Sequence, residues 1–461
     1  MTDKKITASD KAAVMVAQVS AALIRKLGLG MGSNLPGRIA RKISTSVLGN
    51  LAGQTARGGV AVTGTNGKST TSGILSSILR VAGFTFVHNK QGANLVTGIT
   101  ASLVESADWQ KGIDVDLCLF EVDEAALPVV AKEMNIAAVV VTNLFRDQLD
   151  RFGELDTTAR LINSGININK STAILNADDP NVSQLSPEVP HVYFGIESVI
   201  TSQAVQKNME LAYCSKCGKE ISYRRVFYGQ LGHWYCAGCG HERPQPTICA
   251  FDIEVMATSS RFKLRLPGGE ESCILNLPGL FNVYNAVAAA ACAHHLGVSM
   301  EAIRFGIKEY STLFGRSEKL KVEGKDVIVQ LIKNPAGATQ AVASCLLDKK
   351  AQLLIAINDN LADGRDISWL WDADFEQLAD SGFVRFIVSG QRAEDMAVRL
   401  KYAGVASALI KVEPRLAEAL RLALDGLKTG ETLWLMPTYT NLLDLQRILK
   451  GMGCIMSGTE V

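Results

Sequence analysis

The chain has 461 residues, which is enough for two or three domains. Its hydrophobic share of 47% and charged share of 20% are those of an ordinary globular protein with a buried core. The formal net charge is +1, which argues against nucleic acid as a partner, and no apolar run is long enough to span a bilayer.

The first part of the chain, residues 8–53, reads as two helices with a break at Gly28–Pro36. This region is basic, through Arg25, Lys26, Arg38, Arg41 and Lys42. Two interpretations stay open: the helices pack on the next domain, or they rest on anionic lipid headgroups. Because no cleavable signal pattern is visible, we expect a cytoplasmic protein, either free or peripheral at the inner face of the membrane.

The stretch from Gly59 to Ser72, GVAVTGTNGKSTTS, predicts a buried strand, a glycine turn and the start of a helix. Such a turn places unpaired backbone N–H groups and the positive end of a helix dipole at one point, which suits a phosphate. We expect the turn Gly64, Thr65, Asn66 and Gly67, with Lys68, Ser69 and Thr70, to bind a nucleotide. In that interpretation Lys68 reaches the phosphates and Ser69 binds Mg²⁺. The alternative is an ordinary glycine-rich turn.

Strands and helices then alternate as far as about residue 190. The expected strands are short, apolar and rich in β-branched residues, as in a parallel sheet covered on both faces: Thr85–Val87, Leu117–Val122, Ala137–Thr142 and Thr172–Leu175. Acidic residues follow two of them, and carboxylates at neighbouring strand ends facing such a loop suit Mg²⁺. Glu121 is the first choice as ligand, whereas Asp147 and Asp150 serve equally well as helix caps.

Four cysteines interrupt this pattern. Cys214 and Cys217 form one CxxC pair, and Cys236 and Cys239 form a second pair after an 18-residue spacer. This spacing fits a zinc ribbon, in which four thiolates close a tetrahedral, structural Zn²⁺ site. A redox pair is the weaker interpretation. The other six cysteines stand singly in apolar runs and are expected in the core.

Further polar residues follow in the chain. Asn282 and Asn285 stand at the start of an alanine-rich helix, where they suit contacts to an adenine edge or helix capping. Arg316 is a candidate phosphate ligand or a surface arginine. From about residue 320 a second, Rossmann-like α/β unit is expected, with strands at Val327–Ile332, Leu353–Ile357, Val384–Val388, Ala408–Val412 and Thr432–Met436. Its helices are expected at 337–347, 374–381, 392–402 and 414–425.

An acidic loop with two tryptophans, residues 358–374, follows one strand of this second unit. It is either an interface loop or a solvated loop with both Trp side chains in the core.

Taken together, GTNGKST, EVDE, TNLFRDQLDRFG, LNADDP and GLFNVYNAVAAAA resemble the Mur ligases, ATP-dependent enzymes that join an amine to a carboxylate in peptidoglycan synthesis. The chain departs from the usual Mur ligase pattern in three ways, and in these it resembles the MurT branch of that family. They are the missing N-terminal UDP-sugar domain, the four-cysteine insertion, and the run NDNLADGRDISWLWDADFE. MurT proteins are synthetase subunits that amidate the D-glutamate of lipid II, with ammonia from a GatD-like glutaminase.

The resemblance implies a domain plan and site roles. An N-terminal helical segment at 1–54 precedes an ATP-binding domain at 55–316, with the zinc ribbon at about 205–245, and a C-terminal domain at 317–461. Lys68 and Ser69 hold phosphates and Mg²⁺, Glu121 holds Mg²⁺, and Asp366 completes the glutaminase partner's Cys–His pair. Asn282 and Asn285 contact adenine, and Arg316 contacts phosphate. Where many Mur ligases have a histidine this chain has Gln148, and the motif 330–335, QLIKNP, lacks the acid expected on the ribose.

Two rival functions remain. One is a folylpolyglutamate-type or cyanophycin-type ligase, which adds an amino acid instead of ammonia. The other is an ATP-binding scaffold whose zinc ribbon and Trp-bearing loop bind a protein. The chain shows no convincing glutaminase nucleophile of its own, which favours a second subunit.

Overall fold

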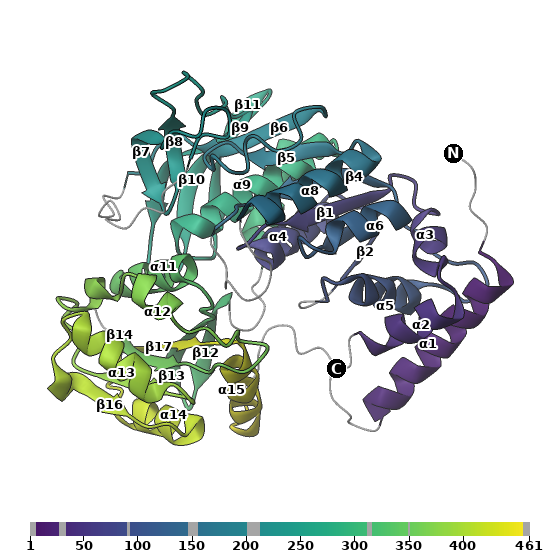
Figure 1. Cartoon of the computed structure of the whole chain (residues 1–461). Helices are drawn as coiled ribbons and strands as arrows, with labels where there is room; N and C mark the ends of the chain where they lie inside the picture. The colour runs from purple at the N-terminus through teal and green to yellow at the C-terminus, as the bar shows by residue number, and fades with distance from the viewer. Residues whose placement is uncertain are drawn as a thin grey trace.

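The computed structural model describes residues 6–26, 34–89, 93–145, 155–200, 213–310, 316–348 and 351–454. Within these ranges the chain forms two large sheets, each between layers of helices, and one small hairpin that stands against the larger sheet (Figure 1). The smaller sheet and its helices, from Arg316 onward, are called the C-terminal unit below.

The larger sheet has nine strands in the described part of the chain, in the order β11-β10-β9-β6-β5-β4-β1-β3-β2. The parallel strands are β1 (Gly59–Thr63), β2 (Phe86–His88), β3 (Leu117–Glu121), β4 (Ile136–Val141), β5 (Thr172–Asn176) and β6 (His191–Ile196). β9 (Ile248–Val255) pairs parallel to β6, whereas β10 (Ser260–Leu266) and β11 (Gly269–Leu275) continue antiparallel.

The parallel strands form because their residues are apolar on both faces and are covered on both sides. Val60 and Val62 face one helical layer and Ala61 faces the other. The first layer is α4 (Lys68–Val81), α9 (Leu280–His295) and α10 (Met300–Glu309). The second contains α5 (Val96–Ser106), α6 (Leu127–Glu133) and α8 (Leu155–Asn169). The expected doubly wound α/β arrangement is confirmed for this part of the sheet.

Three helices precede β1, where two were expected: α1 (Ala8–Lys26), α2 (Leu35–Ile43) and α3 (Val47–Ala52). They bury small residues against α5, and the buried Asp10 ties their ends together. Its carboxylate accepts hydrogen bonds from Ser44 Oγ at 2.6 Å and Asn50 Nδ2 at 2.8 Å. None of the described helices is long and apolar enough to cross a bilayer.

The C-terminal unit has a sheet in the order β12-β13-β17-β14-β15-β16. Its strands are β12 (Arg316–Val322), β13 (Lys325–Gln330), β14 (Ala351–Ala356), β15 (Phe386–Ser389), β16 (Ile410–Val412) and β17 (Thr432–Pro437). Helices α11 (Pro335–Leu346), α12 (Trp369–Asp372), η1 (Phe375–Leu378) and α13 (Ala393–Tyr402) cover one face. Helices α14 (Leu416–Asp425) and α15 (Tyr439–Gly451) cover the other.

Several elements differ from the expectation. The sequence pattern missed the strands β6–β10 and β12 and the helices α10 and α15, and the large sheet is mixed because β9–β11 add an antiparallel edge. Strand β10 alternates exposed and buried residues, RFKLRL, and its charged face hid it from a search for buried runs. The helix expected at 374–381 is a single 3₁₀ turn, η1.

Candidate nucleotide and metal sites

The glycine turn lies at the carboxyl end of β1, which pairs on one side with β3 and on the other with β4. Strand order reverses here, so crossover helices leave in opposite directions and open a crevice at the strand ends. Gly67 ends the turn with φ of 84°, and a Cβ added at Gly67 would clash with the Asn285 side chain. Glycine is needed here both for its backbone angle and for this close approach.

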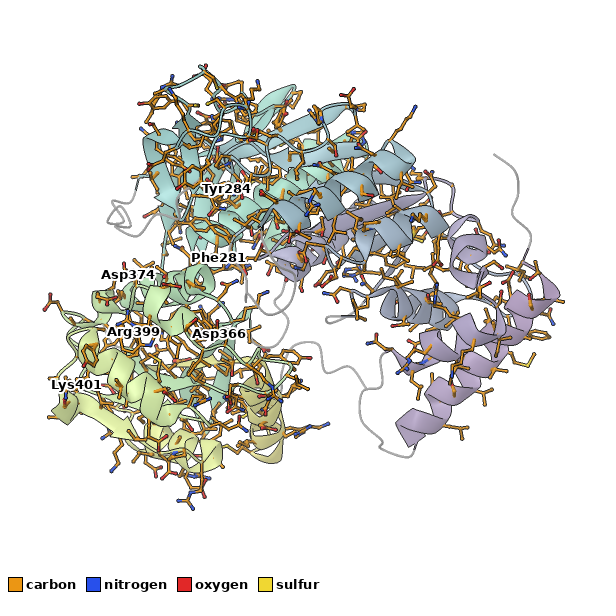
Figure 2. All side chains as sticks on the ribbon, viewed as in Figure 1. Phe281, Tyr284, Asp366, Asp374, Arg399 and Lys401 are labelled. Carbon is orange, nitrogen blue, oxygen red and sulfur yellow. The ribbon has the colours of Figure 1, made fainter. Side chains whose placement is uncertain are left out.

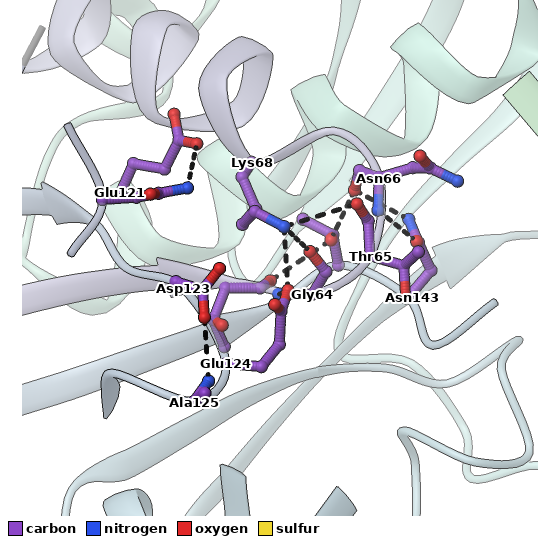
Figure 3. A network of polar contacts seen from close by, with 12 residues as sticks. Gly64, Thr65, Asn66, Lys68, Glu121, Asp123, Glu124, Ala125 and Asn143 are labelled. Atoms are coloured by element: carbon purple, nitrogen blue, oxygen red, sulfur yellow. Dashed lines mark hydrogen bonds and ion pairs between the residues drawn. The ribbon is translucent and has the colours of Figure 1, made fainter. Parts of the chain in front are cut away.

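Lys68, the first residue of α4, turns back over the loop (Figure 3). Its ammonium group lies 2.8 Å from the Glu124 carboxylate and also donates to the Gly64 carbonyl oxygen. The same Glu124 oxygen accepts from the Gly64 N–H at 3.2 Å. Glu124 therefore bonds the two kinds of donor, a loop N–H and a lysine, that a phosphate-binding loop offers to its ligand. Glu124 was not among the predicted site residues, although it stands three residues beyond the strand-end Glu121.

Ser69 and Glu121 lie together on the other side of Lys68. The Ser69 hydroxyl donates to the Glu121 carboxylate at 2.5 Å, and the second Glu121 oxygen lies 3.5 Å from the Asn94 amide. Glu121 is 6% exposed at the end of β3, where the Asn89 side chain accepts from its backbone N–H at 2.8 Å. A P-loop hydroxyl beside a strand-end carboxylate is the pair of protein ligands that Mg²⁺ takes in P-loop enzymes. The donor set at this point therefore fits the metal.

The loop is also held by residues beyond β4. Asn143 forms a two-way amide clamp on Asn66: its Oδ1 accepts from the Asn66 N–H at 2.9 Å, and its Nδ2 donates to the Asn66 carbonyl at 3.0 Å. The Thr142 hydroxyl donates to the same carbonyl oxygen at 2.7 Å. These bonds fix the backbone of the turn, so its remaining N–H groups are oriented before any ligand arrives.

The C-terminal unit reaches the same loop through Lys333 and Asn334. The Asn334 amide donates to Asn66 Oδ1 at 3.0 Å, and Lys333 Nζ lies 3.4 Å from the Thr65 carbonyl oxygen. Asn334 also caps α11 by accepting from the Gly337 N–H at 2.9 Å. Both residues belong to QLIKNP, the motif that lacks the acid expected on the ribose, and neither was a predicted site residue. The Asn-Pro pair at a helix start was the signal that could have drawn attention to them.

Asn285 and Asn282 are both 3% exposed on the first turns of α9. Asn285 lies against Gly67, and its Oδ1 accepts from Thr71 Oγ1 at 3.3 Å. Asn282 accepts from Asn285 at 3.3 Å and donates to the Pro278 carbonyl at 2.7 Å. The structure therefore brings Asn285 to the glycine turn, with Asn282 behind it.

Strands β7 (Ser222–Tyr228) and β8 (Leu231–Tyr235) form a hairpin whose tip reaches the back of the loop. Tyr228 stacks on Phe145 with ring centroids 5.6 Å apart, and Gln230 donates to the Leu144 carbonyl oxygen at 2.8 Å. Phe145 in turn accepts a hydrogen bond from Thr65 Oγ1 through its carbonyl oxygen at 3.1 Å. The hairpin tip is thus connected to the glycine turn through the segment of Leu144 and Phe145.

A buried carboxylate lies where the hairpin tip meets that segment. Asp179 accepts from the Leu144 N–H at 2.8 Å and from Gln230 at 3.3 Å. Burial raises the pKa of Asp179 to about 7, although these donors oppose the rise. The Gln230 side chain is therefore one of the few groups that favour the charged form of Asp179.

The four cysteines gather at the other end of the hairpin. Their sulfur atoms all lie within 4.8 Å of one another; Cys214 and Cys239 are 3.6 Å apart, and Cys217 and Cys236 are 3.4 Å apart. Four sulfurs at about 2.3 Å from one tetrahedral ion stand about 3.8 Å apart, close to this spacing. The cysteine cluster therefore fits a zinc ion. Of the six single cysteines, five are buried as expected and Cys454 is half-buried.

Asp366 lies in the C-terminal unit, on the loop between β14 and α12 (Figure 2). It is half-buried and accepts from the Ser368 N–H at 2.8 Å, a hydrogen bond that lowers the pKa of its carboxyl group. Asp363 anchors the loop by accepting from the N–H of Thr440 at 2.7 Å. Of the two tryptophans nearby, Trp369 is in the core, whereas Trp371 is 54% exposed beside Tyr402.

Several predicted residues cannot be placed. Asp147, Gln148 and Asp150 lie in 146–154, outside the described residues. Arg316 begins β12 and pairs with Gln330 through the backbone, but its side chain is also outside the described part.

Two family models match the chain. The Mur ligase middle domain matches residues 62–231, which include the glycine turn, and the MurT ligase C-terminal model matches residues 331–442, which include Asp366.

Curated relatives extend this likeness over nearly the whole length. The MurT subunit of lipid II isoglutaminyl synthase (glutamine-hydrolyzing) from Staphylococcus aureus strain N315 is 37% identical over 416 residues, 89% of this chain and 91% of that protein. The subunit of the same name from Streptococcus pneumoniae is 33% identical over 91% of this chain and 93% of that protein.

Solved structures share the fold. A pseudomurein peptide ligase type C from Methanothermus fervidus has a TM-score of 0.67 at 24% identity, over 86% of this chain and 78% of that chain. A structure of MurF from Acinetobacter baumannii also has a TM-score of 0.67, at 19% identity over 90% of this chain and 80% of that chain. At the identity and coverage of its curated relatives, the chain belongs to the MurT family of Mur ligases.

Proposed function

We propose that this chain is the synthetase subunit of a lipid II isoglutaminyl synthase. In this proposal it uses ATP to convert the D-glutamate α-carboxylate of lipid II into the carboxamide of D-isoglutamine. The observation that carries the proposal is the loop at the end of β1, where Lys68 and Ser69 stand beside two strand-end carboxylates, in a chain of the MurT family. The same chemistry with an amino acid as nucleophile is the alternative, since the fold is shared with peptide ligases.

The nucleotide site in this proposal is built around the glycine turn. The phosphates lie at the turn from Gly64 to Thr70, on the N–H groups of its last part, Gly67 to Thr70, because the Asn66 N–H is already bonded to Asn143. Lys68 is the cation that faces them. Asn285 and Asn282 contact the adenine, and Arg316 contacts phosphate. Ser69 and Glu121 would hold Mg²⁺, which would supply positive charge against the phosphate oxygens. Lys68 is proposed as catalytic because its charge lies where negative charge develops on the γ-phosphate.

The reaction has two balanced steps. A carboxylate oxygen of the substrate attacks the γ-phosphorus of ATP, the bond to the bridging oxygen breaks, and ADP leaves with an acyl phosphate formed. Ammonia then attacks the acyl carbon, inorganic phosphate leaves, and the nitrogen loses a proton to give the amide. Lys333 and Asn334 of the C-terminal unit touch the glycine turn, so they are placed to orient the reactants on that side.

The ammonia source in this proposal is a GatD-like glutaminase that forms a heterodimer with the chain. Asp366 orients the histidine of the partner's Cys–His pair, as the acid does in other nucleophile–base–acid arrays. Two features support this role: the hydrogen bond from Ser368 lowers the pKa of Asp366 and so keeps it charged, and the exposed Trp371 lies on α12, the helix that follows this loop. A charged acid followed closely in the chain by an exposed aromatic side chain suits an interface.

Zn²⁺ is proposed at Cys214, Cys217, Cys236 and Cys239. All four positions of a tetrahedral ion are then filled by protein, which leaves none for a substrate and makes the role structural. The three parts at 1–54, 55–316 and 317–461 are proposed as domains, with the zinc ribbon inserted in the second.

The Asp366→Asn substitution tests the division of labour. The substitution keeps the shape of the side chain but removes its charge, so glutamine-dependent amidation should fall by at least about 100-fold, while amidation from added ammonium chloride should stay within about twofold. Both activities are measured on the reconstituted heterodimer, with Asp372→Asn at the end of α12 as a control with the same change of charge. Equal loss of both activities would contradict the role of Asp366 in the partner's site.

A further inference from the structure

Helix α1 is apolar on two opposite sides. Its inner side, with Ala13, Val14, Ala17 and Ala21, is buried against the neighbouring helices. Its outer side carries Met15, Val16, Val19 and Leu23, which are 44%, 45%, 55% and 54% exposed. A helix that is apolar all round is normally buried all round, so this outer side has the character of a covered surface.

The exposed residues form one continuous stripe. At 100° per residue, Ala12, Val16, Val19 and Leu23 fall within an arc of about 60°, with Met15 beside them. From Ala12 to Leu23 the residues of this arc carry no charge. On the adjoining helix α2, Leu35 and Ile43 are 43% and 39% exposed. Together these six side chains, Met15, Val16, Val19, Leu23, Leu35 and Ile43, are called the α1–α2 apolar face.

Apart from one buried acid, the charge that α1 and α2 themselves carry has one sign. The basic residues of α1 and α2 are Lys11, Arg25, Lys26, Arg38, Arg41 and Lys42. The one acid of the two helices, Asp10, is buried and bonded to Ser44 and Asn50. Arg41 pairs with Glu133 at 2.6 Å, but Arg38 and Lys42 are exposed. An apolar stripe flanked by basic side chains matches the interface of an anionic bilayer, where acyl chains meet negative headgroups.

The face is joined to the catalytic edge by one helix. α2 packs on the first turns of α5, where Gly37 lies directly against Thr97. The segment just before α5 carries Asn94, which bonds Glu121. In Figure 1, α1 and α2 lie at the outer edge of the molecule, at the opposite end from the β7–β8 hairpin.

We propose that the α1–α2 apolar face docks the protein on anionic membrane. Only the purpose of this docking rests on the proposed function: it would hold the enzyme where a lipid-linked substrate lies. The apolar side chains enter the headgroup region, and Arg38 and Lys42 face the lipid phosphates. The contact proposed is with the surface of the bilayer, so attachment should be reversible and should weaken as salt rises.

The test is sedimentation of the full chain with vesicles, without substrate or ATP, so that its outcome is independent of the catalytic proposal. Wild type should bind vesicles of phosphatidylcholine mixed with phosphatidylglycerol, and should bind pure phosphatidylcholine about tenfold more weakly. Val16→Gln combined with Val19→Gln and Leu23→Gln should reduce binding to the mixed vesicles by about tenfold or more. Glutamine keeps the helix propensity, so circular dichroism should not change.

Two further variants sharpen the result. Arg38→Glu with Lys42→Glu should weaken binding most at low salt. Val129→Gln with Ile168→Gln changes similarly exposed apolar residues on α6 and α8 and should bind as wild type does. Unchanged binding by the triple variant would overturn the proposal. A wild type that does not bind vesicles but dimerises, or that needs this face to hold the glutaminase, would assign the face to a second copy or to the partner instead.

Discussion

At the residue scale, the most informative contact is the one between Lys68 and Glu124. Glu124 accepts hydrogen bonds from both Lys68 and the Gly64 N–H, the groups that the proposed nucleotide phosphates also need. A carboxylate and a phosphate that both contact Lys68 are close enough to repel each other. ATP must therefore displace Glu124 from Lys68 or bind against this repulsion. Glu124 is therefore expected to weaken ATP binding in the free enzyme.

The Glu124→Gln substitution tests this competition. The amide keeps the size of the side chain and removes its charge, so the dissociation constant for ATP should fall by about three- to tenfold. Isothermal titration with a non-hydrolysable ATP analogue measures the effect. Glu301→Gln on the exposed start of α10 serves as a control with the same change of charge. Weaker binding by Glu124→Gln would instead make Glu124 a ligand of the bound nucleotide or its metal.

Much of this site follows from the sequence, because a glycine turn between a buried strand and a helix is a local pattern. The turn from Gly64 to Gly67, the end of β3 at Glu121 and the cysteine pairs are all of this kind. Asn334 is different, since it comes within 3.0 Å of Asn66 only when two sheets are placed side by side. A contact between residues so far apart in sequence carries no local periodicity or turn signal.

At the scale of elements, the β7–β8 hairpin connects the cysteine cluster with the glycine turn. Its tip packs Tyr228 on Phe145 and bonds Leu144 through Gln230, and Phe145 bonds Thr65. Sequence patterns indicated the cysteine cluster but not this connection, because the strands are short and only partly buried. The hairpin is thus expected to support the nucleotide site as well as its own fold.

Loss of zinc should therefore affect both stability and ATP binding. Cys214→Ser should lose the metal, lower the melting temperature and raise the KM for ATP, because the hairpin no longer holds Phe145 in place. Cys454→Ser, at a half-buried single cysteine, should do none of these. Zinc content, thermal denaturation and KM are measured on the same preparations. Normal melting with lost catalysis would contradict a structural role for the metal.

A second variant separates the hairpin tip from the metal. Gln230→Ala should keep its zinc but leave the buried Leu144 carbonyl without this donor, at a cost of about 1–3 kcal/mol. The KM for ATP should rise as in Cys214→Ser. Arg224→Ala, on β7 of the same hairpin, breaks an exposed ion pair with Glu242 and should leave the KM almost unchanged. An unchanged KM in Gln230→Ala would show that the tip does not support the loop.

At the scale of the whole molecule, the C-terminal unit meets the larger sheet at the glycine turn through Lys333 and Asn334. The sequence predicted both α/β units, since each has its own run of buried strands. It did not predict their mutual placement, which depends on contacts between distant segments. The antiparallel edge of the large sheet was also not predicted, because β10 and β11 have exposed, charged faces and do not read as buried strands.

The bridge between the two units gives a further prediction. Asn334→Ser keeps an oxygen that can cap α11 but removes the amide that donates to Asn66. The melting temperature should stay close to that of wild type, whereas turnover at saturating ATP should fall by about tenfold. Asn334→Asp, which also keeps the cap, should behave in the same direction. Wild-type turnover in both variants would show that this contact has no part in catalysis.

In the proposed function, this chain itself forms the amide on a lipid-linked carboxylate. The most direct measurement incubates the purified chain with ATP, Mg²⁺, lipid II and ammonium chloride, and follows the substrate by mass spectrometry. We predict a product in which one OH is replaced by NH₂, formed with wild type and absent with Lys68→Ala. Failure to form this product even after a glutaminase and glutamine are added, while ATP still binds, would contradict the claim and favour a ligase that adds an amino acid.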